Sequence, residues 1–185
     1  IMAANTIDMD AGAAAGLSSA MLDRLKLDEG RIAGIAAAVE QVAILTDPVG
    51  QVIDTHTQPN GLVMERVRVP VGVLGIIYES RPNVTADAAA LGLRSGKAVI
   101  LRGGSEAVNS NRAIHAAMVE GITAAGLPAD AAQLVPTQDR AAVGAMLRAM
   151  GRHPNRPGHI HMKVYADGYA PLTTHLFAAD SPYLD

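Results

Sequence analysis

Two segments of the chain combine arginine with glycine or proline in a pattern that is typical of anion-binding turns. They are Ser80-Arg81-Pro82-Asn83 and Arg102-Gly103-Gly104-Ser105-Glu106. Paired glycines let the backbone approach a ligand closely, and the free N–H groups of a following helix favour an anion. Arg102 adds a guanidinium that can form two parallel hydrogen bonds with a phosphate. These residues predict phosphate binding. An ordinary tight turn with a surface arginine stays open as the alternative, because the three spaced glycines of the dinucleotide motif are absent.

A second candidate chemistry is metal binding by His159 and His161, which alternate in a stretch that predicts a strand over residues 159–164. At a period of two, both imidazoles project from the same face, which suits a shared metal ion. The alternative is a pair of ordinary half-exposed histidines.

The strand that carries these histidines is expected to return through a hairpin. Asp167-Gly168 is a turn signal, and residues 172–177 predict the return strand. A turn centred on those two residues places His161 opposite Thr174 and directs His175 to the other face. A slip of one residue would reverse that placement.

Composition excludes several classes of protein. Among the 185 residues there is no cysteine, which removes disulfides, thiolate metal sites and a cysteine nucleophile. The net charge of −3 argues against nucleic-acid binding. The apolar runs are too short to span a membrane, and no signal peptide is visible, so we expect a cytoplasmic protein. At 49% hydrophobic residues, the chain can form a core.

The elements that position the arginine segments follow an alternating pattern. The order is strand 71–78, helix 85–96 capped by Thr85, strand 98–101, helix 106–125, strand 133–135 and a helix capped by Asp139 that runs to about residue 150. The apolar run 71–78 predicts a strand buried on both faces. This alternation predicts a parallel sheet in an α/β layered domain, with ligands bound at the carboxyl ends of the strands.

The earlier residues predict helices and turns. Residues 10–26 indicate one helix, and Asp28 caps another whose apolar residues Ile32, Ile35 and Val39 recur at helical spacing. Turns are expected at residues 47–50 and 59–61. Near residues 66–69, valine alternates with arginine, which predicts a strand with one solvated face.

We place a domain boundary near Met150–Gly151, because most aromatic residues and histidines follow it. The chain then consists of residues 1–150 and 151–185. The second part is too short to bury a core of its own.

Two runs in the first part closely resemble gamma-glutamyl phosphate reductase, also called glutamate-5-semialdehyde dehydrogenase, of the aldehyde dehydrogenase superfamily. They are Gly72-Val73-Leu74-Gly75-Ile76-Ile77-Tyr78-Glu79-Ser80-Arg81-Pro82-Asn83-Val84-Thr85 and Ser95-Gly96-Lys97-Ala98-Val99-Ile100-Leu101-Arg102-Gly103-Gly104-Ser105-Glu106-Ala107. The resemblance implies a truncated Rossmann-like parallel sheet of aldehyde dehydrogenase type, followed by a short β-hairpin tail. It also implies NADPH-dependent reduction of gamma-glutamyl phosphate, a small-molecule substrate, in proline biosynthesis.

The resemblance also assigns roles to residues. Arg102, Gly103, Gly104, Ser105 and Glu106 would bind NADP(H), with Arg102 suited to the 2′-phosphate of the adenosine ribose. Ser80, Arg81, Pro82 and Asn83 would line the passage shared by the nicotinamide and the acyl phosphate. The family reacts through a catalytic cysteine, and this chain has none. We therefore assign no catalytic residue and expect no activity from this chain alone. No oligomeric state is predicted.

The second part is similar to intradiol dioxygenases, the catechol and hydroxyquinol 1,2-dioxygenases. The similarity starts at Gly151-Arg152-His153-Pro154-Asn155-Arg156-Pro157-Gly158-His159-Ile160-His161 and continues to Asp185. It implies that His159 and His161 are iron(III) ligands and that Arg156 lies near the substrate. The tyrosinate ligands of that family precede the histidines and are missing at the matching positions here, so the iron site would be incomplete.

Three hypotheses remain open on the sequence. The first is a fragment of the reductase joined to a dioxygenase fragment as a chimera. The second is a dioxygenase fragment with an incomplete iron site. The third is a module without activity of its own.

Overall fold

The computed structural model describes residues 1–70, 72–149, 159–164 and 172–177, with side chains described up to residue 148. The chain forms two compact units, Ile1–Ala142 and Val143–Asp185. The division lies before the boundary that composition suggests. Each unit is described by itself.

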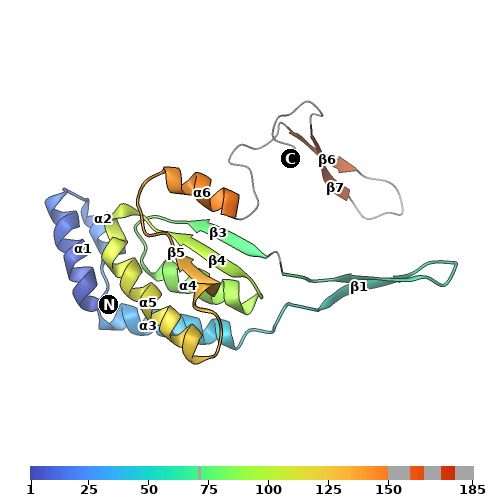
Figure 1. Ribbon diagram of the computed structural model, residues 1–185, viewed down its shortest axis with the longest axis horizontal. Coiled ribbons are helices and arrows are strands. Elements are labelled where there is room, and N and C mark those ends of the chain that lie inside the picture. Colours follow the sequence, from blue (N-terminus) through green and yellow to red (C-terminus); the bar gives the residue numbers. More distant parts are fainter. Residues whose placement is uncertain (71, 150–158, 165–171, 178–185) are drawn as a thin grey trace. The chain divides into compact units, whose positions relative to one another are not determined.

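The first unit contains most of the secondary structure (Figure 1). Its helices are α1 (Met2–Ala14), α2 (Ser19–Leu25), α3 (Glu29–Ala43), α4 (Asn83–Arg94) and α5 (Val108–Ala124), with short 3₁₀ turns at Ser105–Ala107 and Ala129–Ala131. Its strands are β1 (Val52–Thr57), β2 (Val63–Val67), β3 (Val73–Ile77), β4 (Ala98–Arg102) and β5 (Ala132–Leu134).

The central sheet has the order β3-β4-β5, and both of its strand pairs are parallel. Val73 pairs with Ala98, and Val99 pairs with Ala132. Helix α4 connects the first two strands and α5 the next two, as the alternating pattern predicts. This confirms the α/β fold class. Because the strands are parallel, the turns that follow β3 and β4 lie at the same edge of the sheet.

Apolar side chains from β4 and the crossover helices form the core. Val99 and Leu101 of β4 are fully buried and pack with Tyr78, Ala89 and Ile122. A second cluster joins α3 to this layer. There Leu27, Ala86 and Ile114 are buried, and Ile32, Ile35 and Val39 of α3 pack against them. The apolar residues whose spacing predicts α3 are therefore the ones through which this helix packs against the rest of the unit.

Two predicted helix caps form, and one does not. The Asp28 Oδ1 atom accepts from Arg31 N at 2.9 Å at the start of α3, and Asp139 Oδ1 accepts from Ala141 N at 2.9 Å. The prediction that Thr85 caps a helix is wrong, because α4 begins two residues earlier, at Asn83. No side chain caps the start of α4. The Thr85 hydroxyl is instead fully buried and bonded to the side chains of Tyr78 and Asn111.

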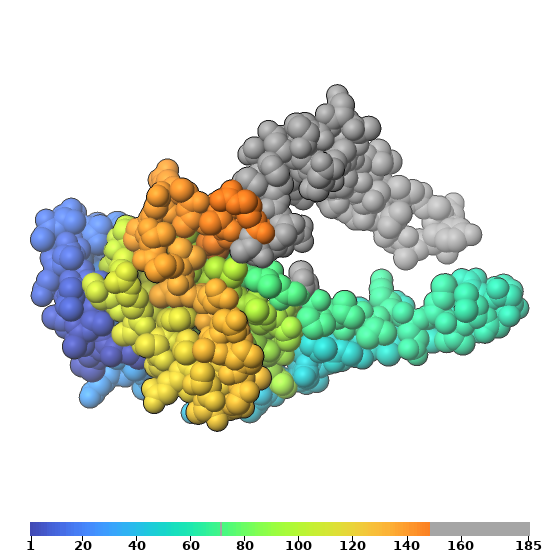
Figure 2. Space-filling model, in the orientation of Figure 1, coloured from blue at the N-terminus to red at the C-terminus, as the bar shows by residue number. Residues whose placement is uncertain are grey.

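Strands β1 and β2 form an antiparallel hairpin that extends away from the rest of the first unit (Figures 1 and 2). Every residue of both strands is exposed, so the prediction of a strand with only one solvated face is wrong. Within residues 1–142, no other helix or strand packs extensively against either face of this hairpin.

The prediction that residues 71–78 are buried on both faces is also wrong. Val73, Leu74 and Ile77 of β3 are 41%, 40% and 52% exposed. The reason is topological: β3 is an edge strand of the three-stranded sheet. An apolar run shows that a strand is suited to burial, but it does not show how many neighbours the strand has.

In the remaining part of the chain, α6 spans Ala141–Ala149, β6 spans His159–Val164 and β7 spans Leu172–Phe177. The two strands pair antiparallel, which confirms the predicted hairpin strands. The predicted register is wrong by one residue, since Val164 pairs with Leu172 and His161 therefore pairs with His175 rather than with Thr174.

Among the helices that the structure describes, none is both long and apolar enough to cross a membrane.

Candidate substrate and cofactor site

The carboxyl ends of β3 and β4 bring the two sequence-predicted segments together. Tyr78 N donates to Arg102 O at 3.0 Å as the strands end. A Cβ atom added to Gly104 would lie 3.3 Å from Glu79 Cα and 3.4 Å from Ser80 N. Contacts this close to backbone atoms explain why glycine stands at this position. The turn after β4 is therefore packed directly against the turn after β3.

A buried hydrogen-bond chain holds these two turns in place. Tyr78 Oη and Thr85 Oγ1 are 2.7 Å apart, and Thr85 Oγ1 donates to Asn111 Oδ1 at 3.1 Å. Burial raises the pKa of Tyr78, and the hydrogen bond with Thr85 offsets part of that rise. The phenol therefore stays neutral at physiological pH. Sequence reasoning missed this chain of contacts, because its members are distant in sequence.

Ser80 carries backbone strain in the same turn. Its φ is +40°, in the left-handed region that a residue with a Cβ atom rarely adopts. Strain of this kind persists only where the surroundings enforce it, and it is concentrated at functional sites. Pro82, next to Arg81, is fully buried and has a packing role at the start of α4.

The segment after β4 has two buried polar atoms without a partner. Arg102 donates from Nη2 to Gln138 O at 2.9 Å, but its Nε is buried and makes no hydrogen bond in the described part of the chain. The Oε2 atom of Glu106 is also buried and makes no hydrogen bond with the described residues. The other carboxylate oxygen, Oε1, lies 3.4 Å from Ser105 Oγ. Such groups cost stability unless something satisfies them. A ligand that offers an anionic oxygen and a hydroxyl would satisfy both.

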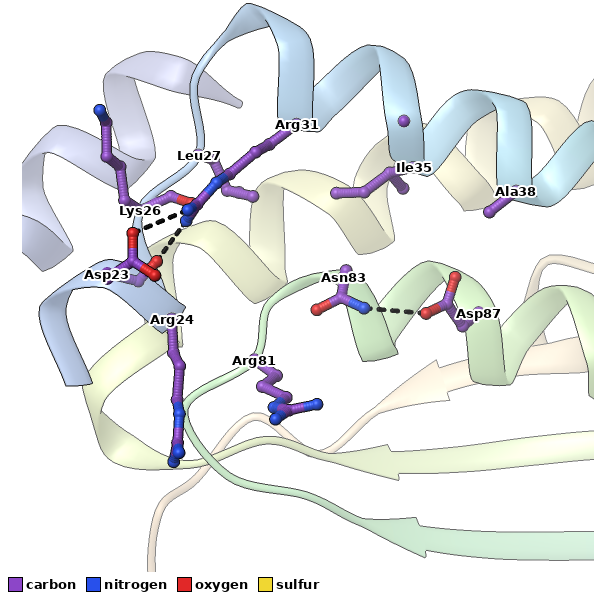
Figure 3. A pocket seen from close by; sticks show the side chains of 11 residues that line it. Asp23, Arg24, Lys26, Leu27, Arg31, Ile35, Ala38, Arg81, Asn83 and Asp87 are labelled. Carbon is purple, nitrogen blue, oxygen red and sulfur yellow. Dashed lines mark hydrogen bonds and ion pairs between the residues drawn. The ribbon is translucent and has the colours of Figure 1, made fainter. Parts of the chain in front are cut away.

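A pocket of ≈ 410 Å³ lies beside the turn after β3 (Figure 3). Its walls come from α2, the α2–α3 connection, α3 and the start of α4. Of the residues assigned to the substrate, Arg81 and Asn83 line this pocket, whereas Ser80 and Pro82 do not. The structure therefore splits the predicted segment into residues that face the pocket and residues that fix the turn.

Three of the six charged side chains that line the pocket are already in ion pairs. Arg31 forms an ion pair with Asp23 at 2.7 Å and donates to Lys26 O at 3.0 Å. Lys26 lies 3.7 Å from Asp28. These contacts fix the connection between α2 and α3.

Three charged side chains lining the pocket have no ion-pair partner among the described residues. Arg24 and Arg81 make no side-chain hydrogen bond or ion pair there. Asp87 only accepts from Asn83 Nδ2, at 2.9 Å. Sequence reasoning missed Arg24 and Asp87, since no motif marks them. Arg24 becomes a neighbour of the predicted segment because α2 and α3 pack beside α4, whereas Asp87 lies one helical turn after Asn83 on α4 itself.

The histidine site is not described by the structure. His159 and His161 are within β6, but their side chains, and all of Arg156, lie outside what is described. Within the described residues, no group of three or more histidine, cysteine, aspartate or glutamate side chains could hold a metal ion.

Comparison with curated proteins identifies close relatives of this chain. Gamma-glutamyl phosphate reductase of Sphingopyxis alaskensis is 63% identical over 186 residues, which cover 98% of this chain and 43% of the relative. The enzyme of the same name from Novosphingobium aromaticivorans is 64% identical and covers 95% of the chain and 42% of the relative. The chain thus spans less than half the length of the curated relatives that it matches.

Solved structures give the same result. The gamma-glutamyl phosphate reductase of Thermotoga maritima is 43% identical, with a TM-score of 0.74. The match covers 79% of this chain and 35% of the Thermotoga maritima chain. The gamma-glutamyl phosphate reductase of Saccharomyces cerevisiae is 33% identical, with a TM-score of 0.69. The match covers 80% of this chain and 42% of the Saccharomyces cerevisiae chain. No family profile matches the chain.

These comparisons give the dioxygenase similarity of residues 151–185 no support. The alignment to gamma-glutamyl phosphate reductase of Rhizorhabdus wittichii, 58% identical, covers 100% of this chain, residues 151–185 included, and 44% of the relative. An iron site and a chimeric origin are likewise unsupported. The chain is therefore homologous to gamma-glutamyl phosphate reductases over somewhat less than half of their length.

Proposed function

We propose that this chain forms the NADPH-binding part, and one wall of the substrate site, of a gamma-glutamyl phosphate reductase. The observation that carries the proposal is the turn after β4. There Arg102 Nε and Glu106 Oε2 are buried without partners among the described residues, in a chain 63% identical to a reductase of that name. A donor and an acceptor left unsatisfied at the carboxyl end of a parallel strand are suited to a bound ligand.

These two side chains fit the adenosine end of NADPH. The Arg102 guanidinium provides a permanent positive charge and a free donor for the 2′-phosphate. Glu106 provides an acceptor for a ribose hydroxyl. Gly103, Gly104 and Ser105 lie between them, and the two glycines let this turn pack closely against Asn111 and the backbone of Glu79, where a Cβ atom would be crowded. When bound, NADPH supplies the hydride for reduction.

The turn after β3 would meet the reacting end of the cofactor and the substrate. Ser80 holds the strained backbone, Pro82 fixes the start of α4, and Arg81 and Asn83 face the pocket. Arg81 is exposed and unpaired within the described residues, so it can offer its charge to an acyl phosphate without breaking an existing ion pair. The resemblance implies that a cysteine attacks this acyl phosphate, and this chain has none. We therefore expect the 185-residue chain to bind NADPH without reducing the substrate.

A fluorescence titration with NADPH and with NADH tests the proposal. The unmodified chain is expected to saturate with NADPH and to bind NADH more weakly. Arg102→Gln should weaken NADPH binding about tenfold, because one charge-assisted contact is lost. The same variant should bind NADH nearly as well as the unmodified chain does.

Arg68→Gln is a matched control, because Arg68 is exposed at the base of the β1–β2 hairpin and belongs neither to the turn after β4 nor to the residues that line the pocket beside α4. Its NADPH affinity should not change. The absence of saturable NADPH binding, or an Arg102→Gln variant with an unchanged preference for NADPH, would contradict the proposal.

A further inference from the structure

We propose that Arg24 and Arg81 together bind the phosphate of the acyl phosphate substrate, and that Asp87 binds its α-ammonium group. The inference rests on the proposed function. It adds Arg24 and Asp87 as residues that determine specificity for a phosphorylated amino acid. Neither residue belongs to the segments that the sequence singles out.

The first argument is the distribution of unpaired charge around the pocket. Lys26 and Arg31 have acidic partners, with Asp28 at 3.7 Å and Asp23 at 2.7 Å. Arg24, on α2, and Arg81, after β3, have none among the described residues. Two free guanidiniums at one pocket match the two negative charges of a phosphate dianion better than they match a single carboxylate.

The second argument is the position of Asp87. It is half-buried on α4, one helical turn from Asn83, whose Nδ2 atom donates to Asp87 Oδ2 at 2.9 Å. That bond leaves Oδ1 free to accept from a ligand, since an ionised carboxylate has about four acceptor sites. The other carboxylate that lines the pocket, Asp23, is paired with Arg31, so Asp87 is the one suited to a cationic group on the ligand.

The third argument is length. Residues 83 and 87 lie on one face of α4, about 6 Å apart along the helix axis at ~1.5 Å per residue. The γ-carbonyl carbon and the α-nitrogen of a glutamyl group are separated by four bonds, about 5 Å when extended at ~1.5 Å per bond. An acyl group beside Asn83 therefore places the ammonium group beside Asp87.

The order of these residues along the pocket agrees with this arrangement. In Figure 3, Arg24 and Arg81 lie toward the α2 end, Asn83 comes next, and Asp87 lies further along α4. Ile35 and Ala38 of α3 face this row and provide an apolar wall for the methylene groups of the ligand. The phosphate, the acyl carbon and the ammonium group thus follow one line.

Three probes separate the two contacts. The first is 2-amino-5-phosphonopentanoate, a stable compound with both the ammonium and a phosphonate. The second is 5-phosphonopentanoate, which lacks the ammonium, and the third is norvaline, which lacks the phosphonate. Calorimetric titration of the full chain at low salt should show that the first probe binds more tightly than either of the others. No saturable binding of the first probe would overturn the proposal.

The variants then assign the contacts. Asp87→Asn should abolish the preference for the first probe over the second, a loss of about tenfold in affinity for the first probe only. Arg24→Gln and Arg81→Gln should each weaken both phosphonates about tenfold and leave norvaline unchanged. Unchanged affinities in Asp87→Asn or in Arg24→Gln would overturn the assignment of that residue and, with it, the proposal.

Three controls keep the result specific. Asp10→Asn and Arg68→Gln remove exposed charges elsewhere, and neither should alter any probe's affinity. Gly34→Leu fills the pocket from α3, where a Cβ atom at residue 34 would meet nothing within 4 Å. This variant should fold, as circular dichroism would show, and lose the first probe. Retained binding of that probe by the folded Gly34→Leu chain would place the ligand elsewhere and contradict the proposal.

NADPH titration of the same variants distinguishes this inference from the proposed function. Arg24→Gln and Asp87→Asn should keep the NADPH affinity of the unmodified chain. If Arg24→Gln weakens NADPH binding, the two guanidiniums belong to the cofactor site and the inference fails while the proposed function stands. If the unmodified chain binds no NADPH, the proposed function fails whatever the phosphonates do.

Discussion

Asp8 is the residue that ties the first helix to the cofactor segment most strongly. Asp8 is 3% exposed, and its carboxylate accepts from Asn109 N, Asn109 Nδ2, Ser110 N and Ser110 Oγ at 3.2, 2.8, 2.7 and 2.7 Å. These donors lie in the first turn of α5, which follows Arg102–Glu106 directly. A negative charge there also interacts favourably with the helix dipole. A residue on α1 thus fixes the helix that presents the proposed ribose contacts.

Replacing Asp8 should therefore destabilise the fold. We expect Asp8→Ala to lower the free energy of unfolding by about 2–4 kcal/mol, since buried donors at the start of α5 lose a charged acceptor. Urea denaturation followed by circular dichroism measures this. Asp10→Ala is the matched control on the same helix, exposed and without a side-chain bond among the described residues, and should change stability by about 0.5 kcal/mol or less. Equal unfolding midpoints for the two variants would contradict this account of Asp8.

At the scale of elements, the contact of Tyr78, Thr85 and Asn111 joins the end of β3 to α4 and α5. Burial raises the pKa of the Tyr78 phenol, and the hydrogen bond with Thr85 lowers it in part. The folded chain therefore holds this proton more tightly than the unfolded chain does. The resulting stability is fully present below the unfolded pKa of about 10 and is lost as the pH rises through the higher folded value.

The expected outcome is a late-titrating tyrosine. Of the chain's four tyrosines, Tyr78 should ionise at higher pH than an ordinary phenol, and the folded state should weaken as it does so. Ultraviolet absorbance of the phenolate during an alkaline titration measures this, and the late component should be missing in Tyr78→Phe. A Tyr78→Phe chain that titrates with the same late component would show that another tyrosine is the buried one.

The predictions from sequence succeed for features that depend on the residues of one helix or strand. They fail for features that depend on how that element packs against its neighbours. The apolar spacing of α3 and the caps at Asp28 and Asp139 are local signals, and the structure confirms them. The burial of β3 depends on its place at the edge of the sheet, which its own residues do not encode. Thr85 looks like a cap by type, but a buried bond to Tyr78 fixes its hydroxyl instead.

At the scale of the whole molecule, the candidate site could be predicted only in part. Parallel strands must end at one edge, so the meeting of the turns around Arg81 and Arg102 follows from the predicted topology. Arg24 could not be found in this way, because it reaches the pocket through packing of α2 and α3 beside α4. Asp87 lies on α4, but no sequence signal marks the face of that helix that lines the pocket. The histidine site proposed for residues 159–161 stays a prediction without support from relatives.

A map of backbone amide shifts on addition of NADPH tests the central claim most directly. The account predicts that amides of Arg102–Glu106 and Ser80–Asn83 shift together and saturate with one affinity. Amides of the β1–β2 hairpin and of β6 and β7 should not move. Saturable shifts confined to those hairpins, or an absence of shifts at the ends of β3 and β4, would contradict it.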